Sequence, residues 1–192
     1  MTSEPLANRW VTLEPLVAAH FEELQRAADD PRLWALTLRD GSGPGFAGWF
    51  AAASAAGCVP YVVRTAAGEV VGSSSLLDLN PAFRTVEIGN TWYAASAQGT
   101  AANPASKRLL LGHGFDTLGL TRVQFQVDAR NARSQAAVLK LGATREGVLR
   151  KHKVTYTGWV RDTVVFSILA DEWPAVRDRL DERLAVLGER PA

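Results

Sequence analysis

The sequence predicts an α/β fold with a mixed, mostly antiparallel sheet of about seven strands flanked by helices. Segments that alternate apolar and polar residues are interspersed with segments of helical periodicity along the whole chain. The resulting order is strand, two helices, three strands, helix, strand, helix, two strands and helix. Such mixing is typical of one layered α/β structure with a β-α-β crossover in its middle.

The first half of the chain supplies four of these strands. Phe21 and Leu24 share one face of the first helix, and glycines at 41–45 separate it from a short Ala-rich helix. Ala67-Gly68 is a turn signal between two strands, which we therefore expect to form a hairpin. The predicted elements are an edge strand over 9–16, helices over 17–28 and 46–56, and strands over 59–64, 69–77 and 85–94.

The second half begins with the clearest helix signal. Asn103 is a good N-cap residue, Pro104 suits the first helical position, and Gly119 ends the apolar pattern. Asn131 is predicted to cap a later helix that stops at Gly142. The remaining predictions are strands over 122–128, 143–156 and 159–169 and a terminal helix capped by Asp171.

Length and composition exclude several classes of protein. The 192 residues suit one domain over 1–192, and a net charge of +1 argues against a sequence-independent nucleic-acid binder. Cys58 is the single cysteine, so no intrachain disulfide can form; we expect it to pack as a small apolar group, and we expect no metal site. Without a signal sequence or an apolar run of about 20 residues, a cytoplasmic protein with no membrane partner is expected.

The segment over 87–104, EIGNTWYAASAQGTAANP, is a candidate phosphate site. A strand ends, a loop rich in small residues follows, and a helix begins. Small side chains let an anion approach the backbone, and the free N–H groups and dipole of a helix N-terminus favour phosphate there. The loop alone is equally compatible with ordinary packing.

The motifs that follow the loop have a specific order. Asn131 and Ser134 form an Asn-x-x-Ser motif, Leu-Gly-Ala follows at 141–143, and Glu-Gly-Val-Leu-Arg follows at 146–150. This run resembles the acetyl-CoA-binding core of the GNAT N-acetyltransferases, and it is most similar to the branch that acetylates N-termini of ribosomal proteins. The resemblance continues through Arg161-Asp162 to 172–174 and covers most of the chain after about residue 59.

The resemblance implies a GNAT fold in which two strands splay apart to hold acetyl-CoA. A primary amine then attacks the thioester directly in a ternary complex, and backbone N–H groups stabilise the charge on the carbonyl oxygen. The implied cofactor contacts are the backbone of Thr91, Trp92 and Tyr93, the loop residues Gln98, Gly99, Thr100, Ala101, Ala102 and Asn103, and the side chains of Asn131 and Ser134.

The chain departs from the family pattern at three positions. Ala101 stands where the family usually has Gly, so the loop keeps its turn only if Ala101 has a negative φ. Asn103 stands where Gly or Ala is usual and is interpreted as the helix cap. Many members carry a proton-donating Tyr where this chain has Val138, so a donor must come from elsewhere.

Two residues are candidates for proton transfer. Glu87 is proposed as the base that takes a proton from the acceptor ammonium, with an exposed strand charge as the alternative. Ser134 is proposed to donate a hydrogen bond to the departing thiolate, with an ordinary first-turn serine as the alternative. A surface role is expected for His152.

The acceptor is left open by the sequence. Trp34, Trp49 and Phe50 could wall its pocket, and core packing explains them equally well. The implied acceptor is a protein or peptide N-terminus. The alternatives are a small-molecule amine, such as an antibiotic, amino acid, polyamine or aminoacyl nucleotide, a domain that binds acyl-CoA without turnover, and an interaction domain that binds no CoA. A monomer or a homodimer is expected.

Overall fold

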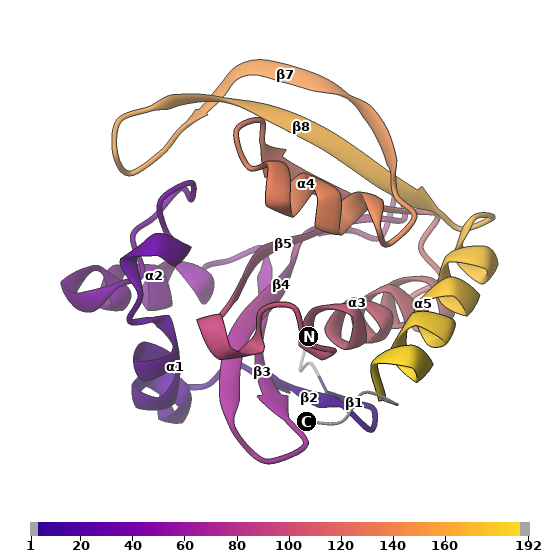
Figure 1. Ribbon diagram of the computed structural model, residues 1–192. Helices are drawn as coiled ribbons and strands as arrows, with labels where there is room; N and C mark the ends of the chain where they lie inside the picture. Colours follow the sequence, from indigo (N-terminus) through magenta and orange to yellow (C-terminus); the bar gives the residue numbers. More distant parts are fainter. Residues whose placement is uncertain (1–3, 189–192) are drawn as a thin grey trace.

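An open sheet of eight strands forms the centre of the computed structural model, which describes residues 4–188 (Figure 1). The strand order is β1-β2-β3-β4-β5-β6-β8-β7. The strands are β1 (Leu6–Ala7), β2 (Val11–Pro15), β3 (Cys58–Thr65), β4 (Val70–Asn80), β5 (Thr85–Tyr93), β6 (Arg122–Asp128), β7 (Thr144–Val154) and β8 (Val160–Leu169). The helices are α1 (Phe21–Ala28), α2 (Phe46–Ala53), α3 (Ala102–Gly112), α4 (Ala132–Leu139) and α5 (Trp173–Gly188).

Only one pair of neighbouring strands, β5 and β6, is parallel among the described residues, and α3 makes the connection between them. This confirms the mostly antiparallel sheet and the central crossover. The strand predicted at 9–16 is confirmed as β2, but its predicted position at the edge is wrong, because Leu6 and Ala7 pair with Leu13 and Thr12 and add an outer strand. A strand of two residues is too short to give an alternating pattern in the sequence.

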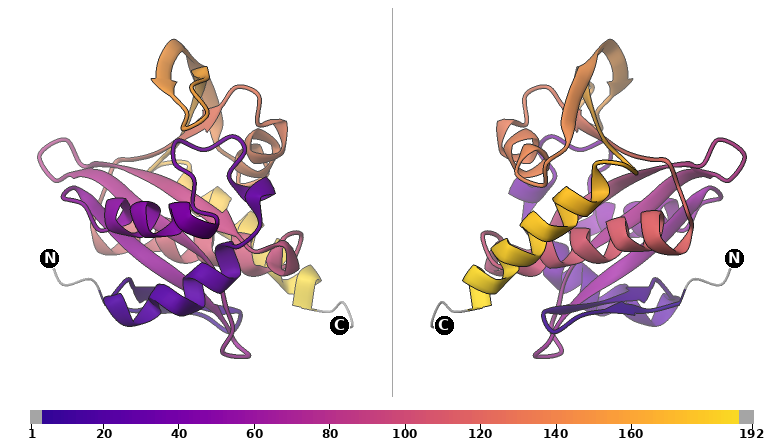
Figure 2. Two further views of the ribbon diagram at one scale, coloured as in Figure 1. Left: turned by 90° about the vertical axis from the view of Figure 1, so that its left-hand side faces the viewer. Right: turned by 90° about the vertical axis from the view of Figure 1, so that its right-hand side faces the viewer.

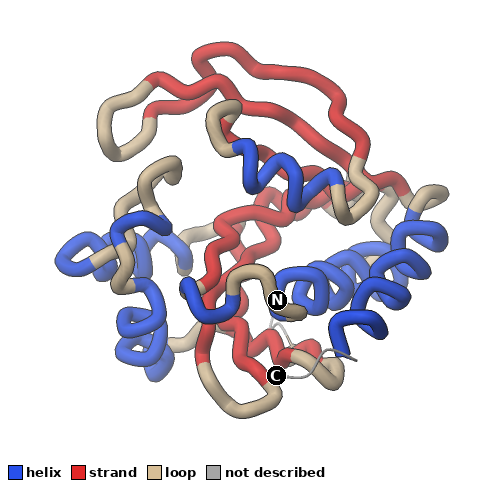
Figure 3. The backbone as a smooth tube through the Cα atoms, viewed as in Figure 1, coloured by secondary structure: helices blue, strands red, loops and turns tan. Residues whose placement is uncertain are grey.

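The sheet separates two groups of helices, as Figures 2 and 3 show. On one face α3, α4 and α5 cover the larger apolar core, to which the sheet contributes side chains such as Ile88, Phe125 and Phe166. On the other face α1 and α2 cover a smaller core over β3, β4 and β5, built around Trp34, Trp49 and Trp92. None of the described helices combines the length and the apolar character that a bilayer span requires.

The start of α3 differs from the prediction. The helix begins at Ala102 with Ala101 as its N-cap, so Asn103 is the second helical residue and makes no side-chain cap. A 3-10 turn over Ala95–Ala97 and the positive φ of Gly99 (81°) bring the chain into the helix early. Pro104 is still tolerated, because N–H groups throughout the first turn lack intrahelical acceptors.

Two other predicted helix boundaries are confirmed. After α3 a π-helical turn continues over His113–Thr117, and Gly119 ends the segment with a φ of 61°. Asn131 caps α4, because its side-chain oxygen accepts a hydrogen bond from the backbone N–H of Ser134 at 3.0 Å. This cap fixes Asn131 and Ser134 at the end of α4 that follows β6.

Candidate functional site

The parallel strands β5 and β6 form a fork. They pair only at Thr85–Arg122, Val86–Val123 and Glu87–Gln124, and then continue to Tyr93 and Asp128 without pairing further. Backbone N–H and C=O groups on the inner side of β5 therefore lack a strand partner beyond Glu87. Buried backbone groups need hydrogen bonds, so an extended ligand can bind here as a strand would.

A β-bulge lies on β5 beside this fork. Ser75 pairs with Gly89 and Ser73 with Trp92, so Asn90 and Thr91 together oppose Ser74. Asn90 takes a φ of 48°, in the left-handed region. Bulges redirect side chains, and here Thr91 is exposed while its hydroxyl reaches Ser74.

Close contact between β4 and β5 keeps the bulge in place. A Cβ atom added to Gly72 would lie 2.2 Å from the carbonyl oxygen of Trp92. We expect Gly72→Ala to push β5 outward and to destabilise the protein by about 1–3 kcal/mol, the usual cost of overpacking. Thermal unfolding and calorimetry with CoA should show a lower Tm and weaker binding. Gly147→Ala, on a strand with open space around the glycine, is the control; unchanged CoA affinity in Gly72→Ala would contradict the prediction.

Side chains of the loop between β5 and α3 form hydrogen bonds with the backbone of the same segment. The Gln98 side-chain amide donates to the carbonyl oxygen of Tyr93 at 2.9 Å, and the Thr100 hydroxyl donates to that of Ala97 at 2.7 Å. Ala101 has a φ of −69°, which any residue adopts. The departure from the family glycine at this position therefore leaves the turn intact.

Free backbone donors gather where this loop meets α3. Among the described residues, the N–H groups of Gly99, Ala101 and Asn103 have no protein acceptor, whereas that of Ala102 donates to the Thr100 hydroxyl at 3.2 Å. An anion at this end of an 11-residue helix would meet these donors and the positive end of the dipole. These donors suit the pyrophosphate of CoA, and Asn103 contributes its backbone N–H group to them.

Glu87 lies at the base of the fork on the sheet face opposite α3. Its side chain is only 6% exposed, so the alternative of an exposed strand charge is wrong. Gln124, its neighbour on β6, donates a long hydrogen bond of 3.5 Å to the carboxylate. Burial raises the pKa of Glu87, against the opposing effects of Lys153, the Gln124 hydrogen bond and Arg161. A carboxyl group with a raised pKa is a stronger base than an exposed one.

Two cations share this face with Glu87, and neither was predicted from the sequence. Lys153 on β7 donates to the Gln126 side chain at 3.1 Å. Arg161 on β8 is buried and donates from Nε to the Thr163 hydroxyl at 3.0 Å, yet no described carboxylate pairs with it. Burial lowers the pKa of Arg161, while Asp128 and Glu87 act in the opposite direction. The alternation of Gln124, Gln126 and Asp128 on β6 was the sequence signal for this polar face.

Asn131 and Ser134 lie on the α3 side of the sheet, away from Glu87. Ser134 is half-buried, and its hydroxyl has no hydrogen-bond partner among the described residues. Val138 is 7% exposed and belongs to the apolar core. On this side of the fork the Ser134 hydroxyl is therefore free to donate, whereas the side chain of Val138 has no polar group.

Lys107 is a further functional candidate, one that was not predicted from the sequence. It is 5% exposed, and its ammonium group donates to the hydroxyls of Thr91 at 2.7 Å and Ser74 at 2.9 Å. Burial lowers the pKa of Lys107 to about 7. The signal was present, because Lys107 precedes Leu110 and Leu111 by three and four residues and so falls on the buried face of the helix.

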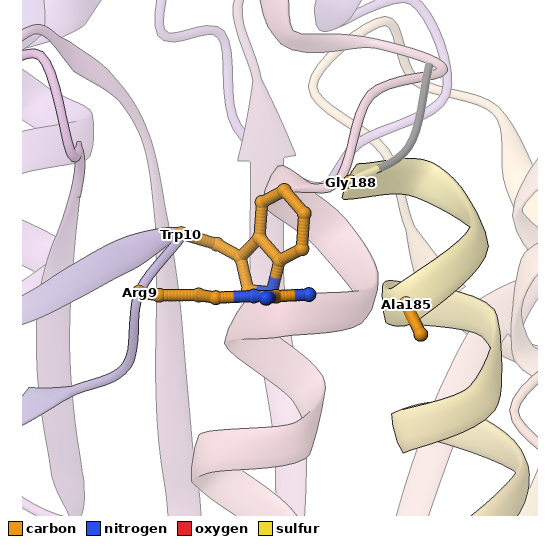
Figure 4. A pocket seen from close by; sticks show the side chains of 4 residues that line it. All are labelled: Arg9, Trp10, Ala185 and Gly188. Carbon is orange, nitrogen blue, oxygen red and sulfur yellow. The ribbon is translucent and has the colours of Figure 1, made fainter.

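The aromatic residues predicted for the acceptor pocket, and the cavities outside the fork, contribute less to the candidate site than the groups above. Trp34 and Trp49 are buried against Trp92, so they are core residues, whereas Phe50 is half-buried. A cavity of about 370 Å³ lies between Arg9, Trp10 and the end of α5, and none of the predicted site residues lines it (Figure 4). His152 is exposed and lines a wider hollow of about 870 Å³ at a bulge of β7. Cys58 is half-buried, and burial raises its pKa, which keeps the thiol protonated.

Comparison with known proteins identifies relatives of the chain. Residues 11–144 match the family described as the acetyltransferase (GNAT) domain. The N-acetyltransferase YoaA of Bacillus subtilis (strain 168), itself uncharacterised, is 33% identical over 106 residues, which are 53% of this chain and 56% of that protein. The chain thus spans about half the length of this curated relative.

Solved structures resemble the whole fold. A protein of T. thermophilus assigned as an acetyltransferase is 38% identical, with a TM-score of 0.85 over 96% of this chain and 98% of that one. Mycobacterium smegmatis RimJ in complex with CoA-disulfide is 24% identical, with a TM-score of 0.78 over 94% of this chain and 93% of that one, and shows the same fold. Since the family match covers well over half of its residues and the fold agrees, the chain belongs to the GNAT acetyltransferase family, whose members use acetyl-CoA.

Proposed function

We propose that this protein, acting as one cytoplasmic domain over 1–192, transfers the acetyl group of acetyl-CoA to a primary amine in a ternary complex. The observation that carries the proposal is the fork between β5 and β6, with the buried carboxyl group of Glu87 at its base. The fork offers a strand-like slot on the α3 side and a base on the opposite face. A cofactor and an acceptor can therefore meet there from two sides.

Each group in the fork has a separate task in this proposal. The free N–H groups at the start of α3 bind the pyrophosphate, and the unpaired backbone of Thr91, Trp92 and Tyr93 binds the pantetheine arm. A backbone N–H at the bulge stabilises charge on the carbonyl oxygen. Glu87 accepts the proton that the acceptor ammonium loses, directly or through water.

Ser134 and Asn131 approach the fork from the β6 side. The hydroxyl of Ser134 has no acceptor among the described residues, so it is free to donate to the CoA sulfur, and Asn131 can bind pantetheine with the amide N–H group that capping does not use. We expect Ser134→Ala to lower kcat about tenfold, the cost of one modest hydrogen bond, in a thiol-release assay. Wild-type kcat in this variant would leave Ser134 as an ordinary helix residue.

Charge on the β7–β8 arm favours one class of acceptor. Over residues 144–169 the chain has five Lys or Arg residues and two Asp or Glu residues, a net charge of +3, against +1 for the whole protein. The arm also exposes apolar side chains, including Val154, Trp159 and Val160. A polycationic amine is repelled by this arm, whereas a peptide N-terminus followed by acidic residues is attracted. We therefore propose a peptide or protein N-terminus as the acceptor.

A matched panel of acceptors tests this proposal. Peptides that differ only in having Asp, Asn or Lys at the second position should be acetylated in that order of kcat/KM, and spermidine should be a poorer acceptor than any of them. Preference for spermidine or for the Lys peptide would contradict the proposed acceptor. CoA binding by calorimetry without turnover on any amine would instead favour a non-catalytic acyl-CoA-binding domain.

A further inference from the structure

A buried lysine joins α3 to the bulge of β5. Lys107 donates to Ser74 and Thr91, and Ser74 and Thr91 share a further hydrogen bond at 2.7 Å. No carboxylate of the described residues forms an ion pair with Lys107. Burying an ammonium group with only neutral partners is costly, so a lysine in this position requires an explanation beyond packing.

The position of Thr91 relates this trio to the fork. Thr91 is exposed and follows the bulged Asn90, on the strand segment where β5 has separated from β6. Ser74 is fully buried behind it. Thr91 is thus the member of the trio that faces the slot proposed for the thioester end of acetyl-CoA.

The hydrogen bonds of the trio determine where the Thr91 hydroxyl donates its hydrogen. An ammonium group has three donors and no acceptor, so both hydroxyl oxygens must accept from protonated Lys107. The hydroxyl hydrogen of buried Ser74 then goes to Thr91, the neighbour at 2.7 Å. The hydrogen of Thr91 is left for the fork, since its own remaining contact, to the Gly89 carbonyl oxygen, is long at 3.4 Å.

We propose that Thr91 is the proton donor to the departing CoA thiolate and that Lys107 is the positioning residue that orients and resupplies it. The inference rests on the proposed acetyl transfer and adds a donor on the β5 side to Ser134 on the β6 side. It also accounts for the absence of a donor at buried Val138.

The step balances in atoms and charge. Glu87 first takes one proton from the acceptor ammonium and releases it to solvent. The resulting neutral amine forms a bond from its nitrogen to the carbonyl carbon and gives a second proton to Glu87, and the C–S bond breaks with its electron pair on sulfur. The sulfur takes the hydrogen of the Thr91 hydroxyl, Thr91 takes one from the Lys107 ammonium, and Lys107 becomes a neutral amine. Solvent returns the proton to Lys107 after CoA leaves.

Deprotonation of Lys107 would reverse this arrangement, because the neutral amine has a lone pair that can accept the hydrogen of Thr91. With a pKa lowered to about 7, that change falls near neutral pH. Burial is the sole cause of the lowered pKa of Lys107. The titratable side chains of the neighbouring strands that lie in the core covered by α3 are Tyr61 and Tyr93. On α5, Asp181 pairs with Arg108 at the surface. The donor form is therefore lost as pH rises through about 7.

The kinetic test compares Lys107→Met, Thr91→Val and Thr91→Ser with wild type from pH 6 to 9. We expect Lys107→Met and Thr91→Val to lower kcat about 10²-fold at pH 6, within the range for general acid catalysis, and Thr91→Ser to restore it. Above pH 7 the wild-type Lys107 becomes neutral, so the ratio of wild-type kcat to Lys107→Met kcat should fall towards one. The pH effects of the acceptor and of Glu87 are the same in both proteins and cancel in this ratio. Arg108→Met, the next residue on α3, is the control for helix damage.

A second measurement observes Lys107 without turnover. The chain has four lysines, so NMR of protein labelled at lysine Cε gives few signals, and the one missing in Lys107→Met is assigned to Lys107. We expect it to titrate near pH 7 and to shift when CoA binds.

Two results would overturn the inference while acetyl transfer stands: a wild-type to Lys107→Met ratio independent of pH, or a Thr91→Val enzyme as fast as wild type. A Lys107 signal that does not titrate between pH 6 and 8 would also overturn it. Absence of acetyl transfer to every amine would instead remove the proposed function, and this inference with it.

Discussion

Replacing Lys107 by Met should make the protein more stable, and most clearly so at acidic pH. The folded-state pKa of Lys107 is lowered to about 7 from 10.5, so the unfolded chain binds more protons between these values. The free-energy cost of burying the Lys107 ammonium is therefore complete below pH 7 and disappears as the pH rises towards 10. The size of the pKa shift sets an upper limit of about 5 kcal/mol on this cost.

Urea unfolding at pH 6, 7, 8 and 9 measures this difference. Methionine fills a similar volume, and Ser74 and Thr91 keep their mutual hydrogen bond, so no buried hydroxyl is left unpaired. The gain in the free energy of unfolding should shrink steadily as the pH rises. A variant less stable than wild type at every pH would show that the ammonium group stabilises the fold. Gain of stability with loss of kcat is the usual sign of a strained functional group.

Replacing Glu87 by Gln should lower kcat at least 10²-fold, as expected for loss of a general base. The amide has the same shape and can still pair with Gln124, so the fold and CoA affinity should be preserved. The wild-type kcat should rise with pH through the raised pKa of Glu87, because only the carboxylate accepts a proton. This acidic limb should vanish in the variant.

A second carboxylate on the same face serves as the control. Glu146 pairs with Arg122 and accepts from Ser167, and hydrogen bonding to Arg122 lowers its pKa to about 2. Glu146→Gln should keep the acidic limb and a kcat close to wild type, since the Glu146 carboxylate is ionised throughout and is held by Arg122 and Ser167. If both variants lose activity equally, Glu87 has no special role as a base.

Local signals in the sequence were enough for the helix ends at Asn131 and Gly119 and for the strand that holds Gln124. Caps, left-handed glycines and strict alternation act over a few residues, so they can be recognised without knowing the fold. The start of α3 was placed too late because Asn103 has a strong capping preference. The turn over 95–97 and Gly99 overrode that preference.

The sequence by itself determined the α/β class, the order of elements, the family resemblance, and Glu87, Asn131 and Ser134 as candidates. Tertiary structure alone decided that β5 leaves β6 after Glu87, that Glu87 and Lys107 lie on opposite faces of the sheet, and that Lys107 reaches Thr91 and Ser74. These features bring together residues far apart in sequence, and burial sets their proton affinities. Burial and contact between distant segments are properties of the packed chain, which local patterns of residues do not encode.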